Sequence, residues 1–185
     1  LLLSFISFCG YSQTSTIISD INTGCAPLEV NFTPPEGIDT YYWEFQNGST
    51  STDKNPTILF TEQGVYNVTL RKTQNGTSID SLIITVFKEP ALSLSPIRYG
   101  CPVFEANIMS TSDLDTNMII NNYIWGFGDG YSDSTTEGET NHNYLSTGSY
   151  HVTLSLETPY PTCNTSKVFR DQIKIYSTPD VSFTS

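Results

Sequence analysis

One aromatic segment, present twice, most constrains the fold of this chain. Residues 123–130 read YIWGFGDG, and residues 41–48 read the related YYWEFQNG. Because side chains alternate between the two faces of a strand, Tyr123, Trp125 and Phe127 share one face of the second copy. Three large rings on one face indicate contact with a hydrophobic core. Each copy therefore predicts a half-buried β-strand.

A glycine-ended dipeptide closes each segment, Asn47-Gly48 in the first and Asp129-Gly130 in the second. Both dipeptides tolerate the positive φ angles of a tight two-residue hairpin turn. We expect Asp129 to accept hydrogen bonds from the N–H groups of the turn and to sit at a position that tolerates the left-handed conformation. Each strand is therefore predicted to reverse direction here.

A second half-buried strand follows each aromatic segment and begins at a glycine, Gly64 or Gly148. Its residues alternate in the way expected of a strand with one buried face. Since both strings recur with the same spacing, the 185 residues predict two similar domains rather than one. The inward positions are Tyr66, Val68 and Leu70 in the first copy and Tyr150, Val152 and Leu154 in the second.

Together, the strings W-x-F-G-D-G and N-P-x-x-x-Y/F-x-x-x-G-x-Y-x-V-T-L resemble the PKD domain. The resemblance covers most of the chain, twice. It implies an all-β fold of two tandem immunoglobulin-like (PKD-type) β-sandwiches, which are common in secreted and cell-surface proteins. The second copy keeps FGDG but has Thr140 in place of the usual proline, whereas the first keeps Asn55-Pro56 but reads FQNG.

The motif residues are expected to build the sandwiches rather than to carry chemistry. Tyr66 and Tyr150 either lock a corner of the sandwich through their hydroxyls, as the tyrosine corner of related folds does, or simply pack. The structural set is Trp43, Phe45, Gly48, Gly64, Tyr66, Trp125, Phe127, Asp129, Gly130, Gly148 and Tyr150.

Residues 1–12 are expected to be a partial signal peptide. Their apolar run LLLSFISF is too short to span a membrane, which takes about 20 residues. Gly10 and Ser12 supply small residues for a cleavage site and predict a mature start at Gln13. The alternatives are a lipoprotein signal with Cys9 acylated and a first strand of the fold.

The remainder is expected to form two sandwiches, residues 13–88 and residues 89–177. Residues 178–185 open a third module, because TPDVSF resembles EPALSL at residues 89–94. Residues 25–32 are expected to form one strand with Leu28, Val30 and Phe32 facing inward, and residues 91–94 another.

Three cysteines remain after the expected signal peptide, and two of them occupy equivalent places. Cys25 and Cys101 each lie just ahead of the second strand of a domain, and Cys163 lies in the last hairpin of the second domain. We expect Cys101 to pair with Cys163 inside one module, which would suit an oxidising compartment. Cys25 is then a buried small hydrophobe or forms an intermolecular or cross-module disulfide.

The charge balance excludes one class of partner. The chain carries 8 basic and 19 acidic residues, for a net charge of -11, and has no Lys or Arg between Arg98 and Lys167. Such a surface repels phosphate backbones, so nucleic acid is not expected as a partner. The acidic surface either maintains solubility or binds cations.

No catalytic motif is present, and the chain is not expected to be an enzyme. His142 and His151 are the only histidines, and nothing in the sequence places a nucleophile beside them. Packing explains His142 better than catalysis, and His151 points away from the core on an exposed strand face. No cofactor is expected.

Calcium is a weak candidate ligand. Asp113, Asp115 and Asn117 have the D-x-D-x-N opening of a calcium loop, but Met118 stands where the loop needs Gly and Ile124 where it needs Glu. The alternative is a polar surface loop.

The expected function is that of non-catalytic spacer and interaction modules in a larger, exported surface or secreted adhesin-like protein. These modules would contact other proteins or surface glycans and neighbouring repeats of the same chain, without a membrane span. Modules that read GCxP near the start and carry a paired downstream Cys look similar to gliding-motility-associated and type IX secreted surface proteins. The alternative is a set of accessory domains of a secreted protease or glycoside hydrolase whose catalytic domain lies outside these residues. A third possibility is a calcium-stiffened adhesin.

Overall fold

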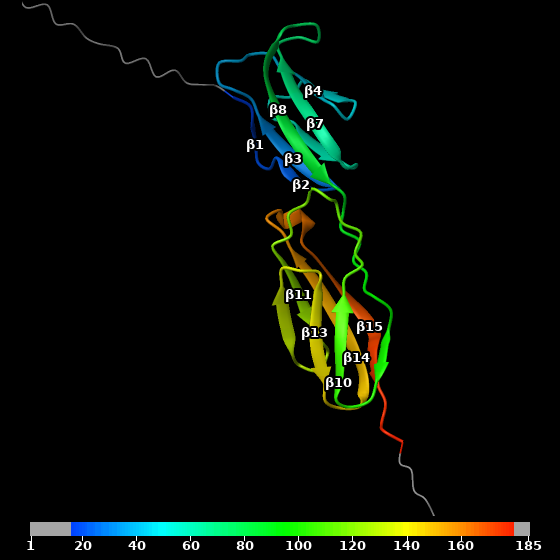
Figure 1. The fold of residues 1–185 in the computed structure, drawn as a ribbon. Coiled ribbons are helices and arrows are strands. Elements are labelled where there is room, and N and C mark those ends of the chain that lie inside the picture. The colour runs from blue at the N-terminus through cyan, green and yellow to red at the C-terminus, as the bar shows by residue number, and fades with distance from the viewer. Residues whose placement is uncertain (1–15, 180–185) are drawn as a thin grey trace, which may run out of the picture. The chain divides into compact units, whose positions relative to one another are not determined.

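A computed structural model of the chain describes residues 16–179 (Figure 1). Within this range the chain forms strands and one short 3-10 helix. The expected signal peptide at residues 1–12, with Cys9 and Gln13, lies outside the described residues. So do residues 180–185 of the segment expected to open a third module.

The first repeat consists of two sheets. One has the strand order β1-β3-β6 and the other has the order β2-β8-β7-β4-β5. The strands are β1 (Ile18–Ser19), β2 (Thr23–Cys25), β3 (Leu28–Thr33), β4 (Tyr42–Phe45), β5 (Ser49–Ser51), β6 (Thr57–Phe60), β7 (Gly64–Arg71) and β8 (Ser78–Phe87).

The strand expected over residues 25–32 is in fact two strands in different sheets. β2 pairs in parallel with the end of β8, whereas β3 pairs with β1. The chain changes sheets at Pro27, which has no N–H to donate to a ladder. The expected inward residues Leu28, Val30 and Phe32 are all buried in β3.

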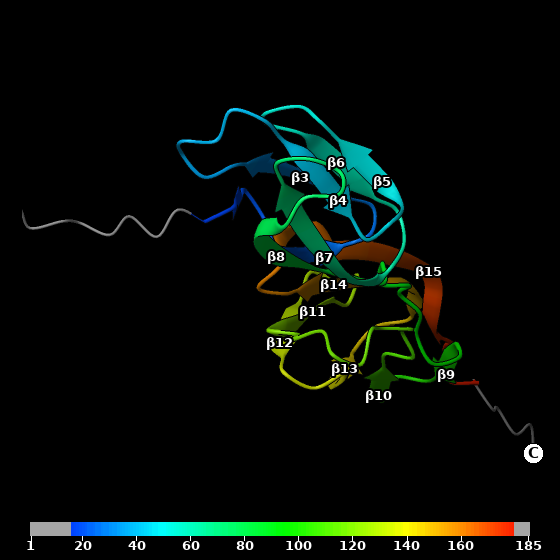
Figure 2. The ribbon, with the colours of Figure 1, turned by 90° about the horizontal axis from the view of Figure 1, so that it is seen from above.

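The second repeat has the same plan. A five-stranded sheet has the order β12-β11-β14-β15-β9, and β10 pairs with β13. In Figure 2 the five strands follow one another in an arc, and β13 and β10 lie on its inner side. The elements are β9 (Arg98–Gly100), β10 (Phe104–Met109), β11 (Asn122–Gly126), β12 (Ser132–Thr135), β13 (Glu139–Tyr144), β14 (Gly148–Glu157), η1 (Pro161–Cys163) and β15 (Thr165–Ile175).

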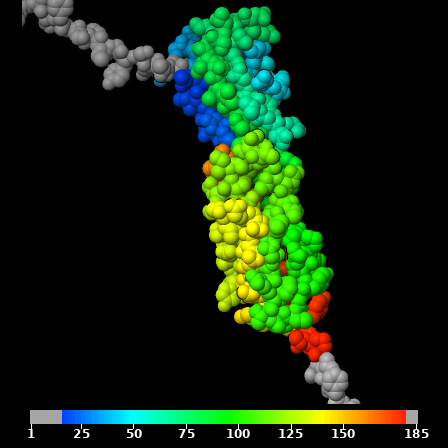
Figure 3. All heavy atoms as spheres, in the orientation of Figure 1, coloured from blue at the N-terminus to red at the C-terminus, as the bar shows by residue number. Residues whose placement is uncertain are grey.

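The strand expected over residues 91–94 is reduced to two isolated bridges, Ala91 to Asp113 and Leu94 to Ser110. Figure 3 shows the residues of β13, in yellow, beside those of β10, in green, on one face of this repeat.

The described chain divides into two compact units whose limits differ from those of the repeats. One unit contains residues 16–22, Glu29–Ile58 and Val65–Ile84. The other contains Thr23–Leu28, Leu59–Gly64 and residues 85–179, so it includes β2 as well as the whole second repeat.

Both tryptophans are fully buried, as the sequence predicts. In the first repeat Trp43 packs against Phe32 at a ring-centroid distance of 5.9 Å, and its Nε1 donates a hydrogen bond to Asp53 O at 2.9 Å. In the second repeat Trp125 Nε1 donates to Thr135 Oγ1 at 3.0 Å. Each indole therefore fills its core without leaving its polar atom unpaired.

The core of the second repeat draws side chains from both of its sheets. Phe127 is buried beside Trp125, and Tyr123 is only partly buried at the edge of the cluster. The remaining buried members are Leu92, Ala106, Ile108, Tyr144, Val152, Leu154, Leu156, Ile173 and Ile175.

The two aromatic strands reverse direction as expected, but through three-residue connections rather than two-residue turns. Phe45 pairs with Ser49 across the first hairpin, and Phe127 N–H donates to Tyr131 O at 3.1 Å across the second. Gly48 has a φ of 90° and Gly130 a φ of 98°. A three-residue loop that ends with a glycine in the left-handed region continues the twist of the strands.

The expected glycine starts and the tyrosine corner are also present. Gly64 begins β7 and Gly148 begins β14. Tyr150 donates its hydroxyl to Ser146 O at 2.8 Å, which locks the corner between β13 and β14. Tyr66 is half-buried at the equivalent position of the first repeat.

Replacing Trp125 by alanine should lower the free energy of unfolding of the second repeat by about 3–5 kcal/mol, because the substitution leaves a cavity in a closed core. Urea unfolding followed by far-UV circular dichroism measures this loss. Leu145→Ala is the matched control, since Leu145 is exposed. Equal unfolding midpoints for Trp125→Ala and the unmodified chain would show that this ring does not support the core.

Candidate functional site

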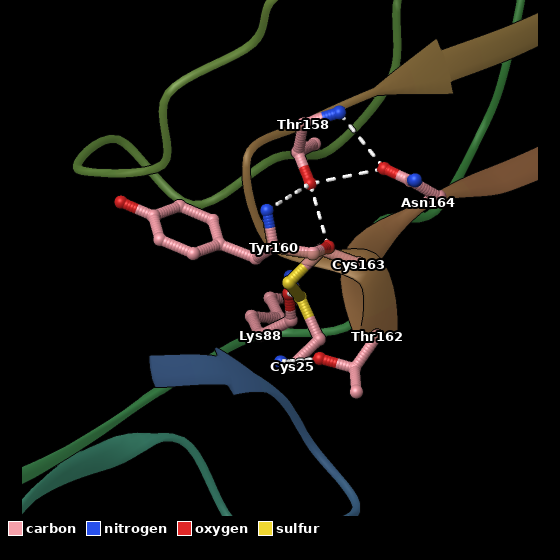
Figure 4. Close-up of a disulfide and its surroundings, with 7 residues drawn as sticks. All are labelled: Cys25, Lys88, Thr158, Tyr160, Thr162, Cys163 and Asn164. Atoms are coloured by element: carbon pink, nitrogen blue, oxygen red, sulfur yellow. Dashed lines mark hydrogen bonds between the residues drawn. A yellow bond between two sulfur atoms is a disulfide. The ribbon is translucent and has the colours of Figure 1, made fainter. Parts of the chain in front are cut away.

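The most distinctive site is a buried disulfide between Cys25 and Cys163 (Figure 4). The two residues are 138 positions apart in sequence, and their Cα atoms are 5.0 Å apart. Cys25 ends β2, and Cys163 ends η1 in the hairpin between β14 and β15. Both belong to the second compact unit, and both side chains are almost completely buried.

The expected pairing of Cys101 with Cys163 is therefore wrong, and Cys101 is a free, exposed cysteine. Cys101 directly follows β9, whose residues pair with the last residues of β15, whereas Cys163 precedes the first residue of β15. Eleven residues of strand separate these ends by roughly 35 Å at about 3.3 Å per residue. A disulfide requires Cα atoms within about 7 Å.

Hydrogen bonds hold the hairpin that carries Cys163. Asn164 Oδ1 accepts from Thr158 N–H at 2.8 Å, and Thr158 Oγ1 accepts from Tyr160 N–H at 3.1 Å (Figure 4). Thr162 Oγ1 accepts from Cys25 N–H at 3.0 Å. The hairpin is thus shaped by its own side chains and attached to β2 by a hydrogen bond as well as by the disulfide.

A glycine beside the disulfide leaves room for two neighbouring side chains. A Cβ atom at Gly24 would lie 2.4 Å from Thr162 Oγ1 and 2.7 Å from a methyl group of Leu28. A side chain at this position would require the Thr162 or Leu28 side chain to move, so Gly24 allows their close approach.

A small apolar cluster surrounds the two sulfur atoms. Phe87, at the end of β8, packs against Tyr160 with ring centroids 5.0 Å apart. Met118 completes the cluster with the two cysteines. The sulfur of Cys25 also lies 3.4 Å from Lys88 O.

Two of the calcium candidates have other partners in the structure. Asp113 forms a salt bridge with Lys88, and Asp115 Oδ1 accepts from Asn117 N–H at 3.0 Å. Among the residues that the structure describes, no three His, Cys, Asp or Glu side chains are grouped to hold a metal ion. Calcium binding by Asp113, Asp115 and Asn117 stays a prediction.

Asp129 and His142 form a pair that the sequence did not predict. His142 Nε2 lies 2.6 Å from Asp129 Oδ2, and the imidazole stacks on Phe127 with centroids 4.0 Å apart. Asp129 Oδ1 accepts from Tyr131 N–H at 3.2 Å, as expected for the turn. The positive φ angles belong to Gly128 and Gly130, so the left-handed role expected of Asp129 is wrong.

The neighbour of this pair is a buried tyrosine rather than an activated nucleophile. Tyr144 donates its hydroxyl to Phe127 O at 3.1 Å. Burial, assisted by the nearby charge of Asp129, raises the pKa of the Tyr144 hydroxyl. A raised pKa keeps the phenol protonated at neutral pH. The imidazole of His142 packs against the rings of Phe127 and Tyr144, as expected. His151 lies on an exposed strand face, also as expected.

Shallow hollows open on the surface of the described residues. One, of about 430 Å³, lies over β4, β5 and β7 and the loop between β4 and β5 in the first unit. The other, of about 460 Å³, is lined by residues that include Ala26, Pro27, Lys88 and Glu89. The first is lined by Glu44, Phe45, Gln46, Gly48, Ser49, Thr50, Asn67 and Thr69.

Comparison with known families gives two matches to the PKD domain, over residues 16–86 and over residues 104–170. The chain belongs to the PKD-domain family. Its PKD domains are non-catalytic modules with an all-β, immunoglobulin-like sandwich fold, and each keeps its tryptophan buried. A structure entitled "Structures of Clostridium thermocellum CbhA fibronectin(III)-like modules" matches 92% of this chain and 100% of that one, with 14% identity and a TM-score of 0.39. Over the described residues, no helix is long and apolar enough to cross a membrane.

Peptide mapping without reduction should recover Cys25 linked to Cys163 and leave Cys101 as a free thiol. Removing the link by Cys25→Ser should lower the free energy of unfolding by about 3–5 kcal/mol, because the disulfide closes a long loop in the unfolded chain. Thermal or urea unfolding measures this loss. The matched control is Cys101→Ser, which should leave stability unchanged, and a linked Cys101 would contradict the observed pairing.

Acid should remove one specific contribution to the stability of the second PKD domain. Thr140 donates its hydroxyl to Asp133 Oδ2 at 2.7 Å, and Ser134 N–H donates to Asp133 Oδ1 at 2.8 Å. These bonds, chiefly that from Thr140, hold the pKa of Asp133 below its usual value. The stabilisation is therefore complete above the unfolded pKa and is lost as the pH falls through the lower, folded pKa.

Thr140→Val should consequently melt earlier than the unmodified chain at pH 7, and the difference should shrink as the pH falls through the lowered pKa of Asp133. Thermal melts between neutral and acidic pH measure this convergence. Thr50→Val on the exposed face of β5 is the control. A difference that is independent of pH would show that the Asp133 carboxylate is not responsible.

Proposed function

We propose that this chain is a non-catalytic extracellular spacer whose two PKD domains are covalently joined, and that it belongs to a larger surface or secreted adhesin-like protein. One observation carries the proposal. Cys25 lies within the first PKD match and Cys163 within the second, and a buried disulfide joins them. Enzyme sites need side chains that converge on a reacting group, whereas this site consists of a cross-link and its supports.

The chemistry of the cross-link supports an exported location. Buried structural disulfides persist in oxidising compartments and are rare in the reducing cytosol. Two tandem PKD domains support the same placement. So does the looser resemblance of the Gly24-Cys25-Ala26-Pro27 string to gliding-motility-associated and type IX secreted surface proteins.

A cross-link of this kind suits a spacer that bears load. The disulfide connects two points 138 residues apart, so the chain between them cannot be pulled out even if both cores unfold. At full extension that length is about 480 Å at about 3.5 Å per residue. The bond would therefore preserve the distance between whatever lies at the two ends of the spacer.

Surfaces for other partners lie at the sheet edges and loops. β5 and β12 are edge strands of the two five-stranded sheets, and their side chains are mainly polar. Edge strands offer unpaired backbone groups, and end loops tolerate variation, so both are suited to contacts with proteins or surface glycans.

Single-molecule pulling between the two termini tests the spacer function. With the disulfide intact, unfolding should release only the residues outside the loop between Cys25 and Cys163. Addition of a reductant should release about 480 Å more, since the hidden residues then extend. Cys101→Ser should behave as the unmodified chain, and an extension that does not depend on the reductant would refute the covalent spacer.

The location is tested separately on intact cells. An antibody raised against the folded chain should label cells that have not been permeabilised, or detect the protein in the medium. Labelling only after permeabilisation would refute the extracellular placement.

A further inference from the structure

The free cysteine of the second repeat occupies the same place in the fold as the bonded cysteine of the first. Gly24 lies opposite Val86 where β2 pairs in parallel with β8, and Gly100 lies opposite Ile175 where β9 pairs in parallel with β15. A cysteine follows each glycine. Cys101 is thus the structural counterpart of Cys25.

Gly24 and Gly100 also lie against equivalent neighbouring side chains. A Cβ atom added at Gly24 would meet Leu28, and one added at Gly100 would meet Phe104, in each case the apolar residue four positions later. The local backbone therefore brings both Gly-Cys pairs to the same position beside the next strand.

The two positions differ in what covers them. In the first repeat, Cys25 is 2% exposed and Phe87 is 6% exposed, because the hairpin that contains Tyr160 and Cys163 packs over them. Residue for residue, the counterpart of Phe87 is Tyr176, which follows Ile175 as Phe87 follows Val86.

In the second repeat this surface is uncovered. Tyr176 and Tyr99 are each 56% exposed, and their rings stack with centroids 6.2 Å apart. Val103 is 69% exposed, and Cys101 is an exposed free thiol beside them. The second repeat therefore presents an apolar, aromatic surface with a cysteine where the first repeat binds a hairpin.

A hairpin cysteine is present in the second repeat and absent from the first. Cys163 lies between the last two strands of the second repeat, whereas the corresponding hairpin of the first repeat, residues 74–77, reads QNGT. The Gly24-Cys25 pair is thus matched by a hairpin cysteine of the repeat that follows it. The sequence TPDVSF at residues 178–183 repeats EPALSL of residues 89–94, as the beginning of a further repeat would.

We propose that Cys101 forms a disulfide with a hairpin cysteine of a following PKD repeat, which packs its hairpin on Tyr99 and Tyr176. The inference rests on the proposed spacer function, because it extends the covalent spacer by one junction. The occupant is a further copy of this module whose hairpin, between its last two strands, carries a cysteine as TPYPTCNT does at residues 158–165.

The bond forms by thiol–disulfide exchange with a low-molecular-weight disulfide such as oxidised glutathione. The Cys101 thiolate attacks the oxidant, forms a mixed disulfide and releases one glutathione thiolate. The hairpin thiolate then attacks the Cys101 sulfur and releases the second. Two cysteine thiols are oxidised to one disulfide, and the oxidant is reduced to two glutathione thiols, whose thiolates take up the two protons that the cysteines lose.

The test appends a second copy of residues 91–179 after Pro179 of the full chain. This junction is in register because Thr178-Pro179 matches Glu89-Pro90. Cys9→Ser removes the only other thiol. After refolding with oxidised and reduced glutathione, peptide mapping without reduction should recover Cys101 linked to the appended copy of Cys163. The free thiol should move from Cys101 to the appended copy of Cys101.

The control is Cys101→Ser in the extended chain, which should leave the appended copy of Cys163 as a free thiol. Circular dichroism of the extended chain shows whether the appended repeat has folded. A Cys101 that stays fully reactive toward a maleimide while the appended repeat is folded would overturn the inference.

If the appended repeat does not fold, mapping of the natural full-length protein decides the matter. A Cys101 linked to a later hairpin cysteine supports the inference, and an alkylated Cys101 overturns it. The outcome is independent of the spacer function, because pulling on the unextended chain tests only the link between Cys25 and Cys163.

Discussion

The Cys25–Cys163 disulfide is the interaction on which the proposed function of this chain depends, and it forms only because several local features meet. β2 and β3 belong to different sheets, and this places Cys25 opposite Phe87 at the end of β8. Gly24 lacks a side chain, so Thr162 can approach and accept a hydrogen bond from Cys25 N–H. Small sandwiches bury only about 60–65% of their unfolded surface, so a covalent link of this kind adds stability where cores alone are marginal.

Much of the fold could be predicted from the sequence, because its evidence is local and periodic. The alternation along β4, β7, β11 and β14 predicted which faces are buried, and Trp43 and Trp125 lie in the cores as expected. Features that depend on which strands pair with one another were harder to predict. Residues 25–32 look like one alternating strand, yet Pro27 cannot donate to a ladder, and the chain changes sheets there.

The site was predicted less well for the same reason. Pairing Cys101 with Cys163 respects the limits of one repeat, but strand β15 places the two residues at opposite ends of the domain. The sequence did contain the evidence for the observed pairing. Cys25 and Cys101 recur at equivalent places, whereas Cys163 has no counterpart in the first repeat. A hairpin cysteine that is missing from the first repeat and present in the second is the pattern expected of a bond between successive repeats. The Asp129–His142 pair joins a loop to β13 and left no such pattern.

The disulfide joins two different parts of the PKD module, so it gives a series of linked modules a head-to-tail order. Its two surfaces differ, since one is the Gly-Cys end of β2 and the other is the hairpin before β15. A contact between unlike surfaces of similar modules leaves one surface of each kind unused at the two ends of a linear series, so further modules can be added by the same contact. In such a series every module that has a successor needs the Gly-Cys pair, whereas the hairpin cysteine is needed only from the second module onward. The observed distribution of Cys25, Cys101 and Cys163 follows this rule.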